Sequence, residues 1–524
     1  MPTLHCEPLT RDLVRALCNA FPRRVVLNRF PLEPYAHDAG MQWEEPLAVA
    51  TPGTEADVAA LVRWCASHDV PITGRGAGSS IAGNAIGSGL VVDFSRRMRR
   101  ILHYDVRRNT VTVEAGVVLA RLNRFLRARG RRIGPSPSSE AFCTIGGMVG
   151  NNAAGSHSLL YGATAENVAS LRAVRSDGEF LEWRGPAKKP RGKLQEHLFS
   201  IAKRFRSPWP NVAKNSSGYL LDRLGNPGAW HPQRIFCGAE GTLGLVSTIT
   251  LRTHPIPRTV ATLLLGFPST EAALESVLPL LSHAPAAVEL VDEAAVTVLH
   301  AKHPALRASA DASACSLVVD LFGRNPSEVR RRTAAIQNDA GVEAENSTVA
   351  YASRDRDALW TARRDVEPVL RELPGRRRPL PFVEDVVVPV DRQVSYVRDL
   401  QRLLTKHGLL APLYGHAGEG NLHVRPFVDL RNRAERETMQ QVNRAVARLA
   451  KRHGGSLTGE HGDGYLRSSL VRRLFPEAHR RFEEVKELFD PEGLFNPGKV
   501  VETRRTSNVR LFLDGPRYTT ARWS

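Results

Sequence analysis

The residues best suited to chemistry stand in two glycine-rich segments of the second half of the chain. His416 and His423 flank a glycine turn in YGHAGEGNLH, and Glu460 and His461 stand together in GEHGD. Imidazole nitrogens and a carboxylate oxygen are ligands of intermediate hardness, which suit Zn²⁺ or Mn²⁺ and leave coordination positions open for a substrate. A single histidine is more often structural, but this grouping within glycine-rich loops favours a metal site.

Three glycine-rich segments of the first half could approach a phosphate or a flat cofactor closely, because small residues leave the backbone N–H groups accessible. They are residues 71–83, 135–155 and 237–244. The first leads into a predicted strand and not a helix, and no Lys-Ser or Lys-Thr follows it, so it is neither a Rossmann fingerprint nor a P-loop. A tight turn is the alternative for each segment, but three in one domain favour a dinucleotide site.

The elements that must position these segments follow from hydrophobic periodicity and from glycine and proline breaks. In the first half the pattern predicts strands at 47–50, 70–73, 90–94, 110–114, 168–174, 235–237 and 245–252, with helices at 57–68 and 118–129. In the second half it predicts helices at 270–282, 327–340 and 392–407 and strands at 317–322 and 382–388. Such alternation indicates a sheet with helices packed on it.

The chain is long enough to form more than one domain, because a single hydrophobic core stops growing at about 250 to 300 residues. The chain has 524 residues, and its clearest boundary is the HPIPR segment at 254–258, whereas residues 184–193 are typical of an exposed loop. We expect an N-terminal segment (1–45), a first domain (46–255), a second domain (256–490) and a C-terminal segment (491–524) that returns to the first domain and ends in a tail.

Composition narrows the possible functions. The hydrophobic share of 42% and charged share of 24% exclude a largely disordered or collagen-like chain. The net charge of +18 creates a field that attracts anions, but the arginine clusters at 96–100, 330–332 and 376–378 are far apart, which favours solvated faces over a specific nucleic-acid site. The cysteines stand singly, so no zinc or iron–sulfur motif is predicted: Cys6, Cys18, Cys65, Cys143, Cys237 and Cys315.

The same features bear on location. The N-terminus MPTLHCEPLTRDL lacks the apolar stretch of a secretory signal, and no run approaches the roughly 20 apolar residues of a membrane span. Isolated cysteines fit a reducing compartment. We therefore expect a cytoplasmic protein, with peripheral contact at the inner membrane as the alternative.

In order and wording, the glycine-rich and histidine segments resemble the FAD-linked oxidase superfamily that includes vanillyl-alcohol oxidase and p-cresol methylhydroxylase. The resemblance runs from about residue 46 to residue 501 and is strongest to the D-lactate and D-2-hydroxyglutarate dehydrogenase branch. It implies an α+β fold: a two-lobed FAD-binding domain of the p-cresol methylhydroxylase (PCMH) type and a substrate, or cap, domain with an antiparallel sheet covered by helices. Because the first glycine loop contains no histidine or cysteine, we expect the FAD to be held non-covalently.

The resemblance also implies which residues bind the cofactor. Those expected around the pyrophosphate are Arg75, Gly76, Ala77, Gly78, Ser79, Ser80, Gly83 and Asn84. Those expected along the flavin and its ribityl chain are Pro135, Ser139, Thr144, Gly146, Gly147, Asn151, Ala153, Gly155 and Ser156. Support for the adenine half is expected from Glu240, Gly241, Gly244 and Val246, and Asn496 in the closing DPEGLFNPGK motif is expected to reach the isoalloxazine.

By the same resemblance, His416, His423 and Glu460 hold a divalent metal and His461 acts as the base. Arg363 would grip the substrate carboxylate, for which a planar guanidinium is well suited, with a surface helix arginine as the alternative. Asn421 could orient the substrate or serve only the turn. Val383 stands where a 2-hydroxyglutarate dehydrogenase is expected to have a lysine, which argues against a dicarboxylic substrate.

The expected function is oxidation of a D-2-hydroxy acid to the 2-oxo acid, with hydride transfer to flavin N5 and metal-assisted loss of the hydroxyl proton. Similar larger proteins continue into an iron–sulfur domain, and this chain has no such cluster motif. We therefore expect an external acceptor, namely a quinone, a cytochrome, an electron-transfer flavoprotein or a separate iron–sulfur protein, or that the chain is the flavin part of a larger system. The alternatives are a flavoenzyme like alkyl-dihydroxyacetone-phosphate synthase and, more remotely, a basic nucleic-acid-binding or scaffold protein.

Overall fold

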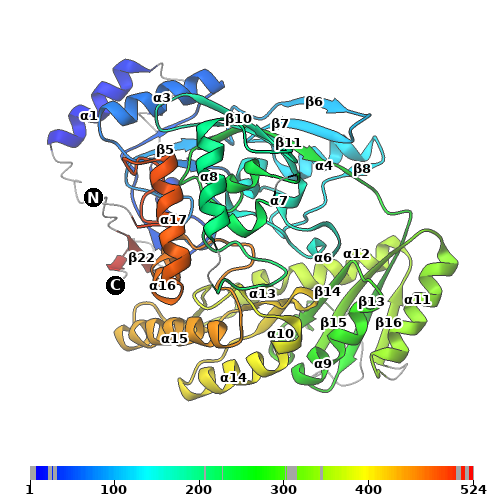
Figure 1. Cartoon of the computed structure of the whole chain (residues 1–524). Helices are drawn as coiled ribbons and strands as arrows, with labels where there is room; N and C mark the ends of the chain where they lie inside the picture. Colours follow the sequence, from blue (N-terminus) through cyan, green and yellow to red (C-terminus); the bar gives the residue numbers. More distant parts are fainter. Residues whose placement is uncertain are drawn as a thin grey trace.

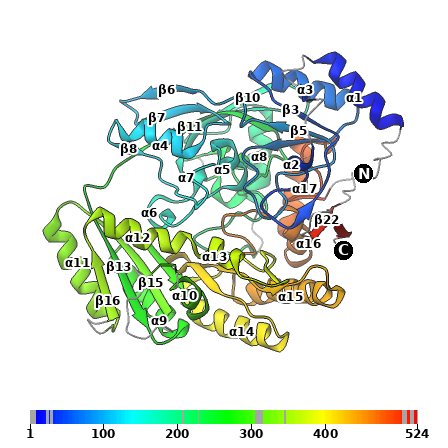
Figure 2. The ribbon, with the colours of Figure 1, turned by 180° about the vertical axis from the view of Figure 1, so that it is seen from behind.

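The computed structural model describes residues 8–21, 26–27, 32–205, 208–226, 228–300, 302–303, 315–342, 346–502, 509–513 and 519–522. Cys6 and part of the C-terminal tail lie outside these ranges. Figures 1 and 2 show two packed parts, one built mainly from the first half of the chain and the other from residues after about 256. No helix among the described residues is both long enough and apolar enough to cross a membrane.

The first part contains two main sheets. In one, β3 (Ala48–Ala50), β5 (Leu90–Asp93) and β4 (Ile72–Arg75) pair in parallel, and β1 (Val26–Leu27) joins β3 antiparallel. The other is antiparallel, in the order β10 (Phe180–Arg184), β9 (Val168–Val174), β11 (Leu245–Arg252), β7 (Thr110–Glu114) and β6 (Ile101–Asp105). Buried residues alternate with partly exposed ones along β11, so one face of this sheet is covered.

The second part is built on one antiparallel sheet of seven strands. Its order is β16 (Ser347–Ala350), β13 (Thr259–Phe267), β15 (Cys315–Gly323), β14 (Ala287–Val291), β19 (Leu413–His416), β20 (Asn421–Val424) and β18 (Val386–Val387). Leu263 and Leu265 of β13 join the same hydrophobic core as Val277 and Ile336, whereas Leu264 belongs to a separate core with Leu359. The two-residue period of the strand therefore supplies one core on each face.

The helices of this part cover both faces of the sheet. Helices α9 (Thr270–Leu281) and α11 (Pro326–Asp339) pack on one face, while α10 (Glu293–Leu299), α12 (Ser353–Arg364) and α13 (Val366–Glu372) lie on the other. Helix α14 (Gln393–Lys406) packs between α9 and α15 (Arg433–Arg452). The predicted α+β architecture, with an antiparallel sheet covered by helices, is thereby confirmed.

The chain then returns to the first part. Helix α16 (Gly464–Leu474) leads into α17 (Pro476–Phe489), which packs against α8 (Gly192–Arg204) of the first part (Figure 1). Beyond them Phe495 forms a bridge with Ile72, and β22 (Arg510–Leu513) pairs with both β2 (Gln42–Trp43) and β23 (Thr519–Arg522).

The remaining elements are short or peripheral. The helices are α1 (Pro8–Ala20), α2 (Glu33–Ala36), α3 (Glu55–Ser67), α4 (Leu119–Arg127), α5 (Ile145–Asn151), α6 (Ser158–Tyr161), α7 (Thr164–Asn167), η1 (Leu221–Arg223), η2 (Pro232–Phe236), η5 (Val390–Arg392) and η6 (Ala417–Glu419). The strands are β8 (Arg131–Arg132) with β12 (His254–Pro255), and β17 (Arg378–Pro379) with β21 (Phe427–Val428).

Two predicted strands are corrected. Residues 235–237 belong to the end of the 3₁₀-helix η2 and the turn after it, because Pro232 at the helix start fixes a helical φ and Gly238 takes a φ of +77°. The strand predicted at 382–388 is paired only at β18 (Val386–Val387). Asp385 just before it adopts a φ of +72°, which breaks the extended conformation.

Candidate active site

A large cavity lies between the glycine-rich loops of the first part and the sheet of the second. Its volume is about 1320 Å³, and residues of both parts line it, including Gly76, Gly147, Arg363 and His416. This is larger than the roughly 300 to 1,000 Å³ of an ordinary ligand pocket. Every predicted site residue lines it except Gly83, Pro135, Asn421 and Asn496.

The first glycine loop follows β4, and its conformation depends on Arg75. The guanidinium donates hydrogen bonds to the carbonyl oxygens of Ala85 at 2.9 Å and of Pro34 and His37 at 3.0 Å each. Gly78 has a φ of +69°, and a Cβ there would lie 2.3 Å from the Arg75 guanidinium. The Arg75 side chain therefore holds the loop in place, and the small residues after it face the cavity.

Contacts of two side chains, Thr144 and Asn496, join the second and third loops to the first. A Cβ at Gly76 would lie 2.2 Å from Thr144 Oγ1, so only glycine allows these loops to approach this closely. The Asn496 side chain is fully buried and donates to the carbonyl oxygens of Asn84 at 2.9 Å and Glu240 at 2.6 Å. Asn496 thus ties the first loop to the third without lining the cavity.

A cluster of imidazoles surrounds one carboxylate oxygen at the end of the cavity. Glu460 Oε1 lies 3.0 Å from His416 Nε2, 3.7 Å from His423 Nε2 and 3.9 Å from His461 Nε2. Donor atoms of His416, His423 and Glu460 all lie within 4.8 Å of one another. The four residues predicted from GHAGEGNLH and GEH are therefore brought together.

The hairpin of β19 and β20 accounts for the two separated histidines. His416 is paired with Asn421 and Tyr414 with His423, so the two imidazoles lie on the same face, one diagonal step apart. Their ring centroids are 5.2 Å apart. Gly420 closes the turn with a φ of +73°, and a Cβ there would lie 1.8 Å from the carbonyl oxygen of Val388.

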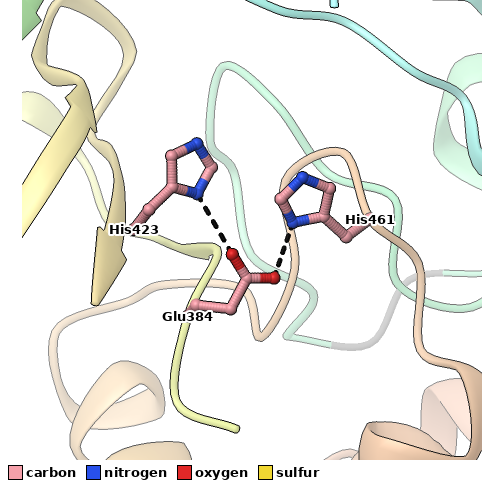
Figure 3. A group of neighbouring side chains, drawn as sticks. All are labelled: Glu384, His423 and His461. Atoms are coloured by element: carbon pink, nitrogen blue, oxygen red, sulfur yellow. Dashed lines mark hydrogen bonds and ion pairs between the residues drawn. The ribbon is translucent and has the colours of Figure 1, made fainter. Parts of the chain in front are cut away.

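Two buried glutamates stand behind the imidazoles. Glu289 Oε1 lies 2.7 Å from His416 Nδ1, and its other oxygen accepts a hydrogen bond from Arg363 at 2.7 Å. Glu384 faces both other histidines: Oε1 lies 2.6 Å from His461 Nδ1 and Oε2 lies 3.3 Å from His423 Nδ1 (Figure 3). In each case the carboxylate contacts Nδ1, which leaves Nε2 directed toward Glu460.

Asp385 fixes the loop that carries Glu460 and His461. Its Oδ2 accepts the backbone N–H groups of Gly459 at 3.0 Å, Glu460 at 3.1 Å and His461 at 2.9 Å. Its Oδ1 accepts the side-chain amide of Asn421 at 3.0 Å. Asn421 is fully buried at this contact, so the geometry supports the turn role and gives it no contact with the cavity.

Models of two protein-family domains match the chain. Residues 46–184 match the family model described as FAD binding domain, and residues 256–500 match the model described as FAD linked oxidases, C-terminal domain. The chain belongs to the FAD-linked oxidase family.

Two curated proteins similar to this chain are named as a dehydrogenase and an oxidase, and a solved structure shares its fold. The chain is 32% identical to a D-2-hydroxyglutarate dehydrogenase of Pseudomonas putida over 85% of its own length and 47% of that protein. It is 29% identical to glycolate oxidase subunit GlcD of Bacillus subtilis over 88% of its length and 91% of that protein. The solved structure of p-cresol methylhydroxylase with substrate bound superposes with a TM-score of 0.69 at 14% identity, covering 95% of this chain and 97% of the other. The chain spans about half the length of the first D-2-hydroxyglutarate dehydrogenases that it matches.

The loops of this FAD-linked oxidase fit a flat dinucleotide. Gly150 and Gly241 line the cavity, and a Cβ added at either would meet no atom within 4 Å, so it would project into space that a cofactor can fill. The asparagines of two loops, Asn84 and Asn151, donate to the carbonyl oxygen of His461 at 3.3 and 3.4 Å. The family's cofactor loops are thus joined directly to the segment that carries the Glu460–His461 pair.

The donor set also fits a divalent cation. Burial alone lowers the pKa of His416 and of His461, but neighbouring carboxylates outweigh burial and raise both to about 9: chiefly Glu289 for His416, and Asp385 with Glu384 for His461. The pKa of His423 is lowered, because burial outweighs the effect of Glu384. This concentration of buried negative charge, with imidazole nitrogens directed at one carboxylate oxygen, is the arrangement that a divalent ion would stabilise. The charge of a bound ion would offset that of the carboxylates and lower the pKa of both imidazoles, which favours the neutral form that a ligand or a base requires.

The predicted carboxylate-binding arginine is buried beside this cluster. Arg363 is 7% exposed in α12, lines the cavity and lies over the Tyr414 ring at 5.2 Å from its centroid. It is therefore not a surface helix arginine. Arg425, also buried and lining the cavity, lies near the same ring, with Nη1 2.9 Å from Glu384 Oε2.

Several residues of the site were not predicted from the sequence. Lys214 is 3% exposed, with Nζ 3.0 Å from Glu419 Oε2 and 3.5 Å from Glu460 Oε2. It begins a segment, residues 214–218, whose polar groups bond to residues 456–463. Glu384 and Asp385 carried a signal that was not used: two acidic residues directly before an apolar strand, VEDVVV, are unusual unless they are buried with partners.

Proposed function

We propose that this FAD-linked oxidase is an FAD-dependent dehydrogenase that oxidises a D-2-hydroxy acid to the 2-oxo acid. The observation that carries the proposal is a single cavity shared by the FAD-binding loops, the buried Arg363 and the His416–His423–Glu460–His461 cluster. The names of relatives support the substrate class, since D-2-hydroxyglutarate and D-lactate dehydrogenases are among them.

In this proposal the roles of the side chains follow from their placement. The Arg363 guanidinium binds the substrate carboxylate, for which its planar donors are suited. His416, His423 and Glu460 would hold a zinc or manganese ion, which when bound would lower the pKa of the substrate hydroxyl. FAD supplies the hydride acceptor. His461 accepts the hydroxyl proton at Nε2, while Glu384 contacts its Nδ1 at 2.6 Å.

The position of Val383 bears on the side chain of the 2-hydroxy acid. Val383 is buried and does not line the cavity, so its position supplies no cation for a second carboxylate. We propose that the electrons pass from the flavin to an external acceptor: a quinone, a cytochrome, an electron-transfer flavoprotein or a separate iron–sulfur protein.

Anaerobic reduction of the flavin tests the proposal. The purified protein should bind FAD non-covalently and lose its absorbance near 450 nm when mixed with a D-2-hydroxy acid. A panel of D-lactate, D-2-hydroxyglutarate, glycolate and the L-enantiomers identifies the substrate class. EDTA treatment should abolish the reduction, and adding Zn²⁺ or Mn²⁺ should restore it. A flavin spectrum that no hydroxy acid changes would exclude this activity, and reduction that survives metal removal would exclude the metal role.

A further inference from the structure

Glu384 is a fully buried carboxylate, 1% exposed, that lies between the two histidines assigned different roles (Figure 3). Its Oε1 is 2.6 Å from His461 Nδ1, and its Oε2 is 3.3 Å from His423 Nδ1. Among the described residues, neither Glu384 Oε2 nor His423 Nδ1 forms a hydrogen bond of full geometry, with each other or with another atom. Their 3.3 Å separation therefore makes an electrostatic contact in which each is the other's candidate hydrogen-bond partner.

Two arginines from different elements hold this carboxylate in place. Arg425, just after β20, lies 2.9 Å from Oε2 through Nη1. Arg467 of α16 lies 3.3 Å from Oε1 and donates to the Glu384 carbonyl oxygen at 3.0 Å. Both arginines are buried, so the charge of Glu384 is balanced where water cannot balance it. Among the described contacts, neither arginine forms a hydrogen bond or ion pair with an imidazole Nε2 atom, so their effect on the histidines passes through Glu384.

An ionised carboxylate accepts hydrogen bonds and donates none. Each neutral imidazole that contacts Glu384 through Nδ1 must therefore carry its hydrogen on Nδ1, which leaves a lone pair on Nε2. Those two Nε2 atoms lie 3.7 Å (His423) and 3.9 Å (His461) from Glu460 Oε1. One carboxylate thus directs two lone pairs into the same small volume.

We propose that Glu384 is a positioning residue that sets the tautomer of both His423 and His461. It keeps His423 Nε2 free to ligate the metal and His461 Nε2 free to accept the substrate proton. The inference rests on the proposed function, in which the substrate O–H bond breaks as a new N–H bond forms at His461 Nε2. FAD, when bound, would take the hydride that leaves as the C2–H bond breaks and the C2=O double bond forms. It adds a residue that touches neither substrate nor metal and yet governs both steps.

The test is Glu384→Gln, which preserves size but replaces one acceptor oxygen with an NH₂ group. One imidazole then faces a donor and must move its hydrogen to Nε2. We expect metal affinity to fall about 10- to 100-fold, as for loss of an outer carboxylate at other metal sites. It is measured on EDTA-stripped holoenzyme titrated with Zn²⁺ or Mn²⁺ against a chromophoric chelator, independently of activity.

A second readout separates the two histidines. At saturating metal, the limiting rate of flavin reduction should still fall by on the order of 100-fold, the usual contribution of a positioned base. The KM for the hydroxy acid should change little, because Glu384 does not touch the substrate. A purely structural role would lower thermal stability without this split between KM and kcat.

Glu367→Gln is the matched control. Glu367 forms an ion pair with the same Arg425 at 3.4 Å, and within the described part of the chain it forms no hydrogen bond or ion pair with a histidine. It should leave metal affinity and the limiting rate within about threefold of wild type, a difference of about 0.65 kcal/mol. Equal losses in both variants, or wild-type values in Glu384→Gln, would overturn the inference.

Two further outcomes are distinguishable. If Glu384→Gln does not yield a flavin-loaded protein, Glu384→Asp keeps the charge for both arginines but withdraws the oxygens by one methylene. Wild-type metal affinity in the Asp variant would then refute the inference. If the wild type reduces no hydroxy acid, the proposed function fails, while the metal titration still decides whether Glu384 orients His423.

Discussion

At the scale of single residues, the proposed function gives the charged groups of the site two kinds of role: some bind the substrate, and others orient the histidines. Arg363→Lys tests the first kind, because lysine keeps the positive charge but loses the planar pair of donors that suits a carboxylate. We expect the KM for the hydroxy acid to rise at least about tenfold, corresponding to 1.4 kcal/mol or more. The limiting rate of flavin reduction should fall less.

The neighbouring Arg364 provides the control for this prediction. It lies on the same helix, α12, but its side chain is exposed and donates to Thr361 Oγ1 at 3.3 Å. Arg364→Lys should change neither constant measurably in stopped-flow reduction of the flavin. A wild-type KM in Arg363→Lys would remove Arg363 from the carboxylate site.

Residue types and spacing were enough to predict some members of the site and not others. His416, His423, Glu460 and His461 could be found because they stand in two short glycine-rich segments, YGHAGEGNLH and GEHGD, where such a grouping of histidines favours a site over a structural role. Glu289 could not, because it stands singly within the apolar strand β14 (Ala287–Val291), and only the fold places it 2.7 Å from His416. Lys214 likewise gave no signal, because its carboxylate partners, Glu419 and Glu460, are more than 200 positions away.

At the scale of elements, the register of the β19–β20 hairpin decides whether His416 and His423, the two histidines proposed to hold the metal, lie close together. Gly420→Ala should disrupt it, because φ is +73° there and the added Cβ would lie 1.8 Å from the Val388 carbonyl oxygen. A left-handed φ and a backbone clash together cost roughly 1 to 3 kcal/mol or more. We expect a lower midpoint of thermal unfolding and a weakened metal site in the same protein.

Gly408→Ala separates the free-energy cost of a positive φ from that of a steric clash. Gly408 follows α14 with a φ of +63°, but a Cβ there would meet no atom within 4 Å. This variant should lose only about 1 kcal/mol and retain wild-type metal affinity. If both variants bind Zn²⁺ or Mn²⁺ as the wild type does, the hairpin turn does not control the distance between the histidines.

The elements themselves were predictable where periodicity was regular. The predicted strands 168–174 and 245–252 coincide with β9 and β11, and buried side chains alternate with partly exposed ones over the eight residues of β11. Prediction failed at 382–388, where apolar residues suggested a full strand but Asp385 takes a positive φ to receive three backbone N–H groups. A tertiary contact with the loop 459–461 outweighed the local preference, and no local pattern reports such a contact.

At the scale of the whole molecule, the site exists only because distant segments meet. Glu460 Oε2 accepts the backbone N–H of Gly155 at 2.5 Å, which joins a glycine-rich loop of the first part to the His416–His423–Glu460 group of the second. Two domains and a cofactor loop could be expected from the sequence. Which loop would touch Glu460 could not, because that depends on how the two parts pack.

The net charge of +18 is also a property of the whole molecule, and it leads to a prediction about rates. A positive field raises the encounter rate with an anionic substrate, and salt screens that field over about 10 Å at 0.1 M and about 3 Å at 1 M. The second-order rate constant for anaerobic flavin reduction by a 2-hydroxy acid should therefore fall several-fold between low and high NaCl. The limiting rate at saturating substrate should stay constant, because Arg363, His416 and His423 are buried and little screened. A second-order constant that does not respond to salt would show that the surface charge does not guide the substrate, and a limiting rate that falls in parallel would show that salt disturbs the site itself.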